Sequence, residues 1–126
     1  MQVSYELVGA YQRVINEEPL TTNSDWDAVI GFINQYQLVP LIERDLFRLQ
    51  RMAQNQNLHE YKWEVLKWRF HIHLFNFEWK AARDLLFQMV STAEEWGATN
   101  PNAAYYGKWA LSRIALFYWL VDGDTN

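Results

Sequence analysis

The chain contains no cysteine among its 126 residues. Disulfides, thiolate nucleophiles, zinc fingers and iron–sulfur clusters are therefore excluded, because each of them depends on cysteine sulfur. A chain of this length can bury one hydrophobic core without covalent cross-links. We therefore expect residues 1–126 to form a single domain that is held together by packing alone.

Glycine and proline are scarce, with five and three residues respectively. β-Sandwiches and barrels need many turns, and phosphate-binding loops need several glycines, so both are disfavoured. The longest apolar run covers only residues 114–121. A membrane-spanning helix needs roughly 20 apolar residues, so we expect no membrane span. The N-terminal residues also lack the basic and apolar regions of a signal peptide, which together with the absence of cysteine favours a cytoplasmic location.

Acidic residues outnumber basic ones by 15 to 11, which gives a formal charge of −4. Residues 1–39 carry −4, residues 40–70 carry +2 and residues 71–126 carry −2. Neutralisation of phosphates supplies most of the affinity of proteins for nucleic acids. An acidic chain with one mildly basic middle section therefore argues against nucleic acid as the main partner.

Half of the residues are hydrophobic, and 17% are aromatic. Apolar residues recur every three to four positions, which is the spacing of amphipathic helices. The pattern predicts an all-α domain of about six helices packed as antiparallel helical hairpins. The expected helices cover about residues 3–17, 24–36, 40–53, 58–77, a fifth ending near 96, and 101–121. Ser24 is the expected N-cap of the second helix, Gly97 the expected residue after the fifth, and Asn100–Pro101 the expected start of the sixth.

The expected helix over residues 58–77 carries most of the aromatic residues and is apolar on two nearly opposite sides. One stripe contains Tyr61, Val65, Trp68, Ile72, Phe75 and Trp79, and the other contains Trp63, Leu66, Phe70, Leu74 and Phe77. A helix of this kind is predicted to lie between neighbours on both sides. Residues 69–79 also alternate between polar and apolar, so a strand remains an alternative there.

The C-terminal third resembles the helical hairpins of tetratricopeptide repeats. Trp79, Ala82, Leu86 and Met89 are similar to the second helix of such a unit, and Ala115–Asp124 is similar to the end of a first helix followed by its Gly-Asp turn. The resemblance covers about residues 79–124 and departs from the repeat at Phe70, where a small residue is usual. It implies packed helical hairpins that bind other proteins.

The sequence offers little catalytic chemistry. His71 and His73 diverge by about 200° on a helix and cannot share a metal ion there. A proton relay between Glu64 and His71 is conceivable, although a solvated helix edge explains both residues. No serine or glycine-rich motif of a known catalytic type is present. We therefore expect no enzymatic activity, no metal and no cofactor.

Two sets of residues are candidates for partner binding. Phe87 and Trp119 lie away from the buried stripes of their helices and, with Tyr105 and Trp109, are candidate aromatic anchors, because aromatic residues are enriched in binding hot spots. The second set is the arginine row, defined as Arg44, Arg48 and Arg51, which lies on one side of the third expected helix.

The arginine row is either a solvated face or a docking site for an acidic partner, because guanidinium groups pair well with carboxylates. The sequence thus predicts a non-enzymatic protein-interaction module, such as an adaptor, chaperone, immunity protein or inhibitor. Its partner would be another protein or a second copy of the chain. The alternative is an RNA-associated helical subunit of a larger complex that uses the arginine row.

Overall fold

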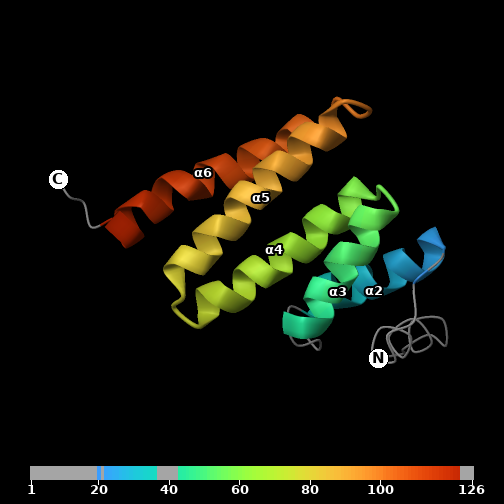
Figure 1. The fold of residues 1–126 in the computed structure, drawn as a ribbon, viewed down its shortest axis with the longest axis horizontal. Helices are drawn as coiled ribbons and strands as arrows, with labels where there is room; N and C mark the ends of the chain where they lie inside the picture. The colour runs from blue at the N-terminus through green and yellow to red at the C-terminus, as the bar shows by residue number, and fades with distance from the viewer. Residues whose placement is uncertain (1–19, 21, 37–42, 123–126) are drawn as a thin grey trace.

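The computed structural model describes residues 20, 22–36 and 43–122, and these residues form five α-helices without a strand (Figure 1). The helices are α2 (Asn23–Tyr36), α3 (Glu43–Asn55), α4 (His59–Phe75), α5 (Trp79–Gly97) and α6 (Ala103–Asp122). The all-α prediction is confirmed. The expected helix over residues 3–17 lies outside the described residues.

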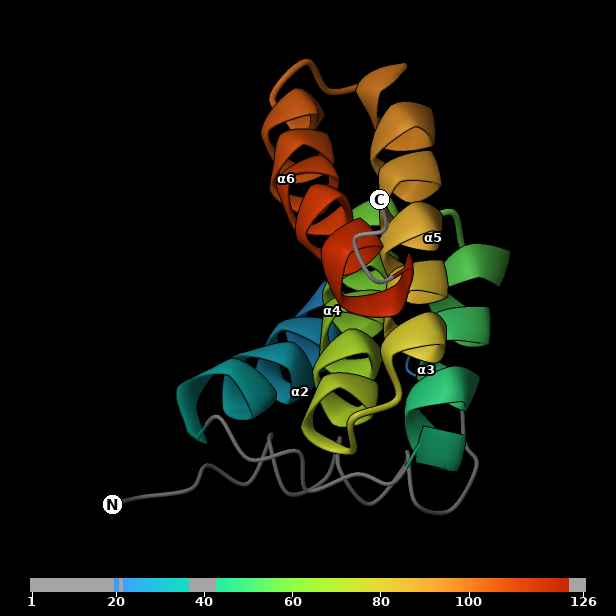
Figure 2. The same ribbon diagram turned by 90° about the vertical axis from the view of Figure 1, so that its left-hand side faces the viewer.

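Helix α4 is the central element. It packs against α2 and α3 on one side and against α5 on the other, and α6 lies along α5 (Figures 1 and 2). Its two apolar stripes account for this position, because each stripe enters a different hydrophobic cluster. The prediction that this helix lies between neighbours on both sides is therefore confirmed.

The first cluster joins α4 to α2 and α3. Val65 and Trp68 of α4 are buried there, and Tyr61 and Ile72 pack at its edge. The ring of Tyr61 stacks on that of Trp26 in α2 at a centroid distance of 5.4 Å. The other buried members are Leu20, Val29, Ile30, Leu46, Leu49 and Ala53.

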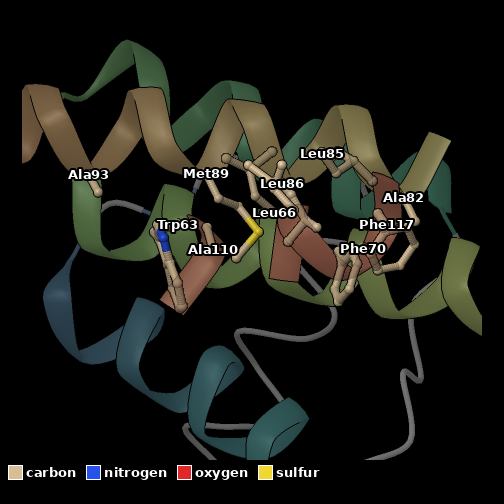
Figure 3. Packing of buried hydrophobic residues seen from close by; sticks show 11 residues of the cluster. Trp63, Leu66, Phe70, Ala82, Leu85, Leu86, Met89, Ala93, Ala110 and Phe117 are labelled. Atoms are coloured by element: carbon tan, nitrogen blue, oxygen red, sulfur yellow. The ribbon is translucent and has the colours of Figure 1, made fainter. Parts of the chain in front are cut away.

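The second cluster joins α4 to α5 and α6 (Figure 3). Trp63, Leu66 and Phe70 supply its α4 side, and Trp63 and Phe70 both meet the ring of Trp109 in α6 edge-on. The buried members from α5 and α6 are Ala82, Leu85, Leu86, Met89, Ala93, Ala110, Ile114 and Phe117. Most of the aromatic excess in the sequence is therefore used to fill the interior.

The turn at residues 76–78 corrects the sequence interpretation in this region, where we expected the fourth helix to continue to about residue 77 with its aromatic residues buried. Helix α4 ends at Phe75, and Phe77 adopts the left-handed conformation with a φ of 61°. The N–H of Phe77 donates to the carbonyl of Leu74, and the N–H of Glu78 donates to that of His73. This is a Schellman motif, which usually has glycine or asparagine at the left-handed position. Because a phenylalanine occupies that position here, the sequence did not indicate where the helix ends.

The turn also changes the surroundings of three aromatic side chains. Phe75 and Phe77 are 64% and 75% exposed, so the prediction that they continue the two buried stripes is wrong. Trp79 begins α5 and packs against the second cluster instead of the first, and its ring meets that of Phe117. The two stripes of α4 stop where the backbone leaves the helix.

The same kind of turn joins α3 to α4. Asn57 has a φ of 57°, its N–H donates to Gln54, and the N–H of Leu58 donates to Ala53. Asparagine tolerates the left-handed region better than a bulky side chain does. The polar run that predicted the end of this helix therefore contains a residue suited to the turn.

Three predicted helix ends differ in detail from the structure. The N–H of Asp25 donates to Thr22 Oγ1 at 3.1 Å, so Thr22 caps α2 and Ser24 lies inside the helix. Gly97 is the last residue of α5 and is followed by a right-handed Ala98, so it is not a left-handed cap. Asn100 accepts a hydrogen bond from the N–H of Asn102, and α6 begins after that turn.

Among the helices that the structure describes, none combines the length and apolar character needed to cross a membrane.

Candidate functional site

An open groove lies between the C-terminal half of α5 and the N-terminal half of α6. It encloses about 380 Å³, and its lining comes only from these helices and Pro101 in their connection. Small residues dominate the lining, which consists of Val90, Ala93, Glu94, Gly97, Pro101, Ala103, Ala104, Gly107, Lys108 and Leu111. We call this feature the outer groove, because no residue of α4 contributes to it.

The floor of the outer groove is formed where α5 and α6 approach each other closely. A Cβ atom placed on Gly107 would lie 3.5 Å from the Cβ of Ala93, which is ordinary van der Waals contact. Gly97 has open space around the position of its missing Cβ. The hollow therefore exists because side chains that would fill it are absent on both helices.

Two rows of side chains line the two sides of the outer groove and continue beyond it along α5 and α6. Arg83, Phe87, Val90, Glu94 and Gly97 form the α5 row, and Ala104, Lys108, Leu111, Ala115 and Tyr118 form the α6 row. Members of each row are alternately four and three residues apart, so they share one side of their helix. The two rows contact each other beyond the groove, where the guanidinium of Arg83 lies 5.4 Å from the centroid of the Tyr118 ring.

The outer groove combines apolar side chains with two opposite charges. Leu111 lines the hollow and is exposed, and Phe87 and Tyr118 are exposed in the same rows beyond it. Glu94 on α5 and Lys108 on α6 line the hollow from opposite helices. Within the part of the chain that the structure describes, neither of these two side chains takes part in an ion pair.

The candidate anchors predicted from the sequence lie in different places. Phe87 belongs to the α5 row, whereas Tyr105 is exposed and lies about 90° around α6 from the α6 row. Trp109 is half-buried in the second cluster, and the guanidinium of Arg113 lies 3.5 Å from its ring centroid. The side chain of Trp119 lies outside the described residues. The structure therefore does not bring these residues together into one site.

The arginine row lies on α3, which packs on α4. Arg44 and Arg51 are exposed, and Arg48 is half-buried. The ring of Phe47 on the same helix is exposed and lies beneath the guanidinium of Arg69, at 5.0 Å. The arginine row and the outer groove are thus on different helices, with α4 between them (Figure 1).

The ring of His71 is partly buried and makes a hydrogen bond within α4. Its Nδ1–H donates to the carbonyl of Lys67 at 2.8 Å, and its ring lies beside those of Trp68 and Phe70. Burial lowers the pKa of His71 below its ordinary value of 6.5, and the charges of Lys67 and Arg113 act in the same direction. The carboxylate of Glu64 pairs with the ammonium of Lys67 at 2.9 Å. These surroundings therefore favour the neutral form of the His71 ring over the charged form.

The region of the chain with described coordinates contains no group of three or more histidine, aspartate or glutamate residues that could hold a metal ion.

The sequence interpretation missed most of the outer groove. Gly97, Ala104 and Gly107 carry little hydrophobic signal, and Val90 and Leu111 look like ordinary members of amphipathic helices. The repeated spacing of four and three residues in both rows was the available signal. It becomes informative only when the pairing of α5 with α6 is known.

Comparison of the chain with protein families, with curated proteins and with solved structures found no match.

Proposed function

We propose that this chain is a non-enzymatic protein-interaction module whose outer groove receives a helix of a partner protein. The observation that supports this proposal most is the hollow of about 380 Å³ with a floor of small residues and exposed apolar side chains along it. Grooves of this type bind amphipathic helices through large side chains spaced at i, i+3, i+4 and i+7. The proposal includes an antiparallel arrangement of the helical hairpins, similar to that of tetratricopeptide repeats.

A plug variant provides the test. Gly97→Leu should fill the hollow without strain, because open space surrounds the missing Cβ and the residue ends a helix with ordinary backbone angles. Gly31→Leu in α2 is the matched control, since Gly31 is also exposed with open space around its missing Cβ.

The experiment places a photo-crosslinking amino acid at Leu111, in cells that naturally make the protein. We expect adducts with a helical segment of a defined partner, and we expect Gly97→Leu to abolish them while Gly31→Leu leaves them intact. Adducts that persist in the Gly97→Leu variant would contradict the proposal.

Two alanine variants then locate the binding surface on the α5–α6 pair. Phe87→Ala should weaken association about tenfold or more if Phe87 acts as an anchor, because truncated anchors typically cost over 1 kcal/mol. Tyr105→Ala should have little effect, since Tyr105 lies about 90° around α6 from the α6 row and does not line the hollow. The reverse result would move the binding surface to the side of α6 that carries Tyr105.

A further inference from the structure

We infer, on the basis of the proposed helix-receiving groove, that its occupant is an amphipathic helix of another protein with oppositely charged flanks. Beside the hollow, the flank that faces α5 carries a basic side chain and the flank that faces α6 carries an acidic one. The spacing of the two rows, the shape of the floor and the two charges of the outer groove support this assignment.

The spacing of the rows favours a single helix as occupant. The alternation of four and three residues is the heptad spacing with which helices pack knobs into holes. A third helix laid between the α5 row and the α6 row would meet such spacing on both sides. The hollow beside Gly97 would accept one large apolar side chain, because it encloses about 380 Å³ and open space surrounds the position of the missing Cβ.

A second copy of the chain fits this shape less well. A two-fold contact through the same face would place one outer groove against another, hollow against hollow. Filling a hollow requires a ridge, which a single amphipathic helix with large apolar residues presents. The shape of the outer groove therefore favours a segment of a different protein.

The charges define the flanks of the incoming helix. Glu94 and Lys108 line the hollow from opposite helices, so a helix between them meets a negative group on one side and a positive group on the other. Arg83 also belongs to the α5 row, but it lies 11 residues from Glu94, which is about 16 Å along a helix. This exceeds the screening length of about 10 Å at 0.1 M salt, so Glu94 dominates the α5 flank beside the hollow.

Three synthetic helical peptides of equal length test the inference with the full chain. All carry leucine at the heptad a and d positions. The first has lysine on one flank and glutamate on the other, the second has lysine on both flanks, and the third has glutamate on both. A helix with mixed flanks can satisfy both rims in one of its two binding directions, whereas each uniform helix meets one like charge.

We expect the mixed peptide to bind about fivefold more tightly than either uniform peptide at low salt, with the difference shrinking as salt is added. In Glu94→Lys the all-glutamate peptide should become the tightest binder, and in Lys108→Glu the all-lysine peptide should. Isothermal titration calorimetry measures each affinity, with Gly97→Leu and Gly31→Leu as the blocked and unblocked controls.

Each alternative outcome is decisive. Equal affinities for the three peptides, all lost in Gly97→Leu, would refute the charged flanks and leave the helix-receiving groove standing. Absence of peptide binding, or binding that Gly97→Leu does not reduce, would refute the groove as well. Self-association that sedimentation detects in the native chain and not in Gly97→Leu would identify a second copy as the occupant, which also overturns the inference.

Discussion

The inner and outer faces of the α5–α6 pair differ in how they are covered. The inner face meets α4, and aromatic side chains such as Trp63 and Phe70 fill the space between the three helices. The outer face has no such cover from the described residues, and its floor is built from glycine and alanine. Leu86 on the inner face is fully buried, whereas Leu111 on the outer face is 54% exposed.

The difference shows that apolar surface alone does not identify a binding site. Both faces carry apolar residues at helical spacing, and sequence periodicity treats them alike. What distinguishes the outer face is that small residues of α5 and of α6 lie next to each other, so that neither helix fills the space between them. Binding of a partner side chain in such a hollow is favourable, because it removes apolar surface from water and forms van der Waals contacts that are otherwise missing.

The same substitution on the two faces should give the largest contrast. Leu86→Ala should lower the free energy of unfolding by about 2–5 kcal/mol, because it leaves a cavity in a closed core. Leu111→Ala should lower it by less than about 1 kcal/mol, because water already reaches half of that side chain. Urea denaturation followed by circular dichroism measures both values, and comparable losses would show that the outer face is also part of the core.

The turns before and after α4 each contain one left-handed residue, and exchanging the two residue types tests what that conformation costs. Phe77→Asn should raise the free energy of unfolding by about 1 kcal/mol, because a left-handed conformation costs a bulky residue about 1–2 kcal/mol and its exposed ring contributes little in return. Asn57→Phe should lower it by a similar amount. Thermal unfolding of both variants checks the pair. A loss of stability in Phe77→Asn would mean that the contact of Phe77 with Trp79 outweighs the backbone cost.

Gly107 lies where the two faces of α6 meet and gives a smaller effect. Gly107→Ala should raise the free energy of unfolding by about 0.5–1 kcal/mol, because alanine restricts the unfolded chain and its Cβ fits at 3.5 Å from Ala93. Chemical denaturation tests this value. Destabilisation would show that α5 and α6 pack there without room for a methyl group, and that the floor of the outer groove requires glycine.

The smallest expected effect concerns pH and the inner region around α4. The lowered pKa of His71, which results mainly from burial, means that the unfolded chain binds more protons than the folded one at pH values just below 6.5. The free energy of unfolding should therefore fall as the pH decreases below about 6.5 and should be fully retained above it. The melting temperature of His71→Gln should fall less than that of the native chain between pH 7.5 and 5.5.

Glu60 contributes to the pH dependence of the free energy of unfolding with the opposite sign. Its pKa is raised above 4.5, first by burial and then by the charges of Asp27 and Glu64. An acid with a raised pKa in the folded state binds more protons there, so stability increases as the pH falls through that range. This contribution is common to both chains and cancels in the comparison. Parallel pH profiles for the native chain and His71→Gln would contradict a role for His71.

Much of the fold could be predicted from the sequence because α4 encodes its own environment. Its two stripes need two partners whatever the remaining chain does, and Val65 and Leu66 accordingly enter different clusters. The buried residues of α3 and α5, such as Leu46 and Met89, follow from the same periodicity. Helical spacing is a local property, so it can be read without knowledge of tertiary contacts.

The position of the turn after Phe75 could not be predicted in the same way. Asn76 is the only residue among 76–78 that is typical of turns, and a phenylalanine at the left-handed position opposes local preference. Tertiary packing of α4 against α5 offsets that preference. The strand-like alternation over residues 69–79 left a strand as an alternative, and the structure confirms the helix that we expected up to Phe75.

The sequence by itself determined the helical class, the central position of α4 and the exclusion of cysteine chemistry, because each follows from composition or from spacing along one helix. Only the tertiary structure decided the location of the outer groove. A hollow forms where two packed helices both have small side chains at the same level. The sequence cannot show this, because only packing places Gly107 against Ala93. The opposition of Glu94 and Lys108 has the same origin, because the distance between charges on different helices is set by packing and not by sequence separation.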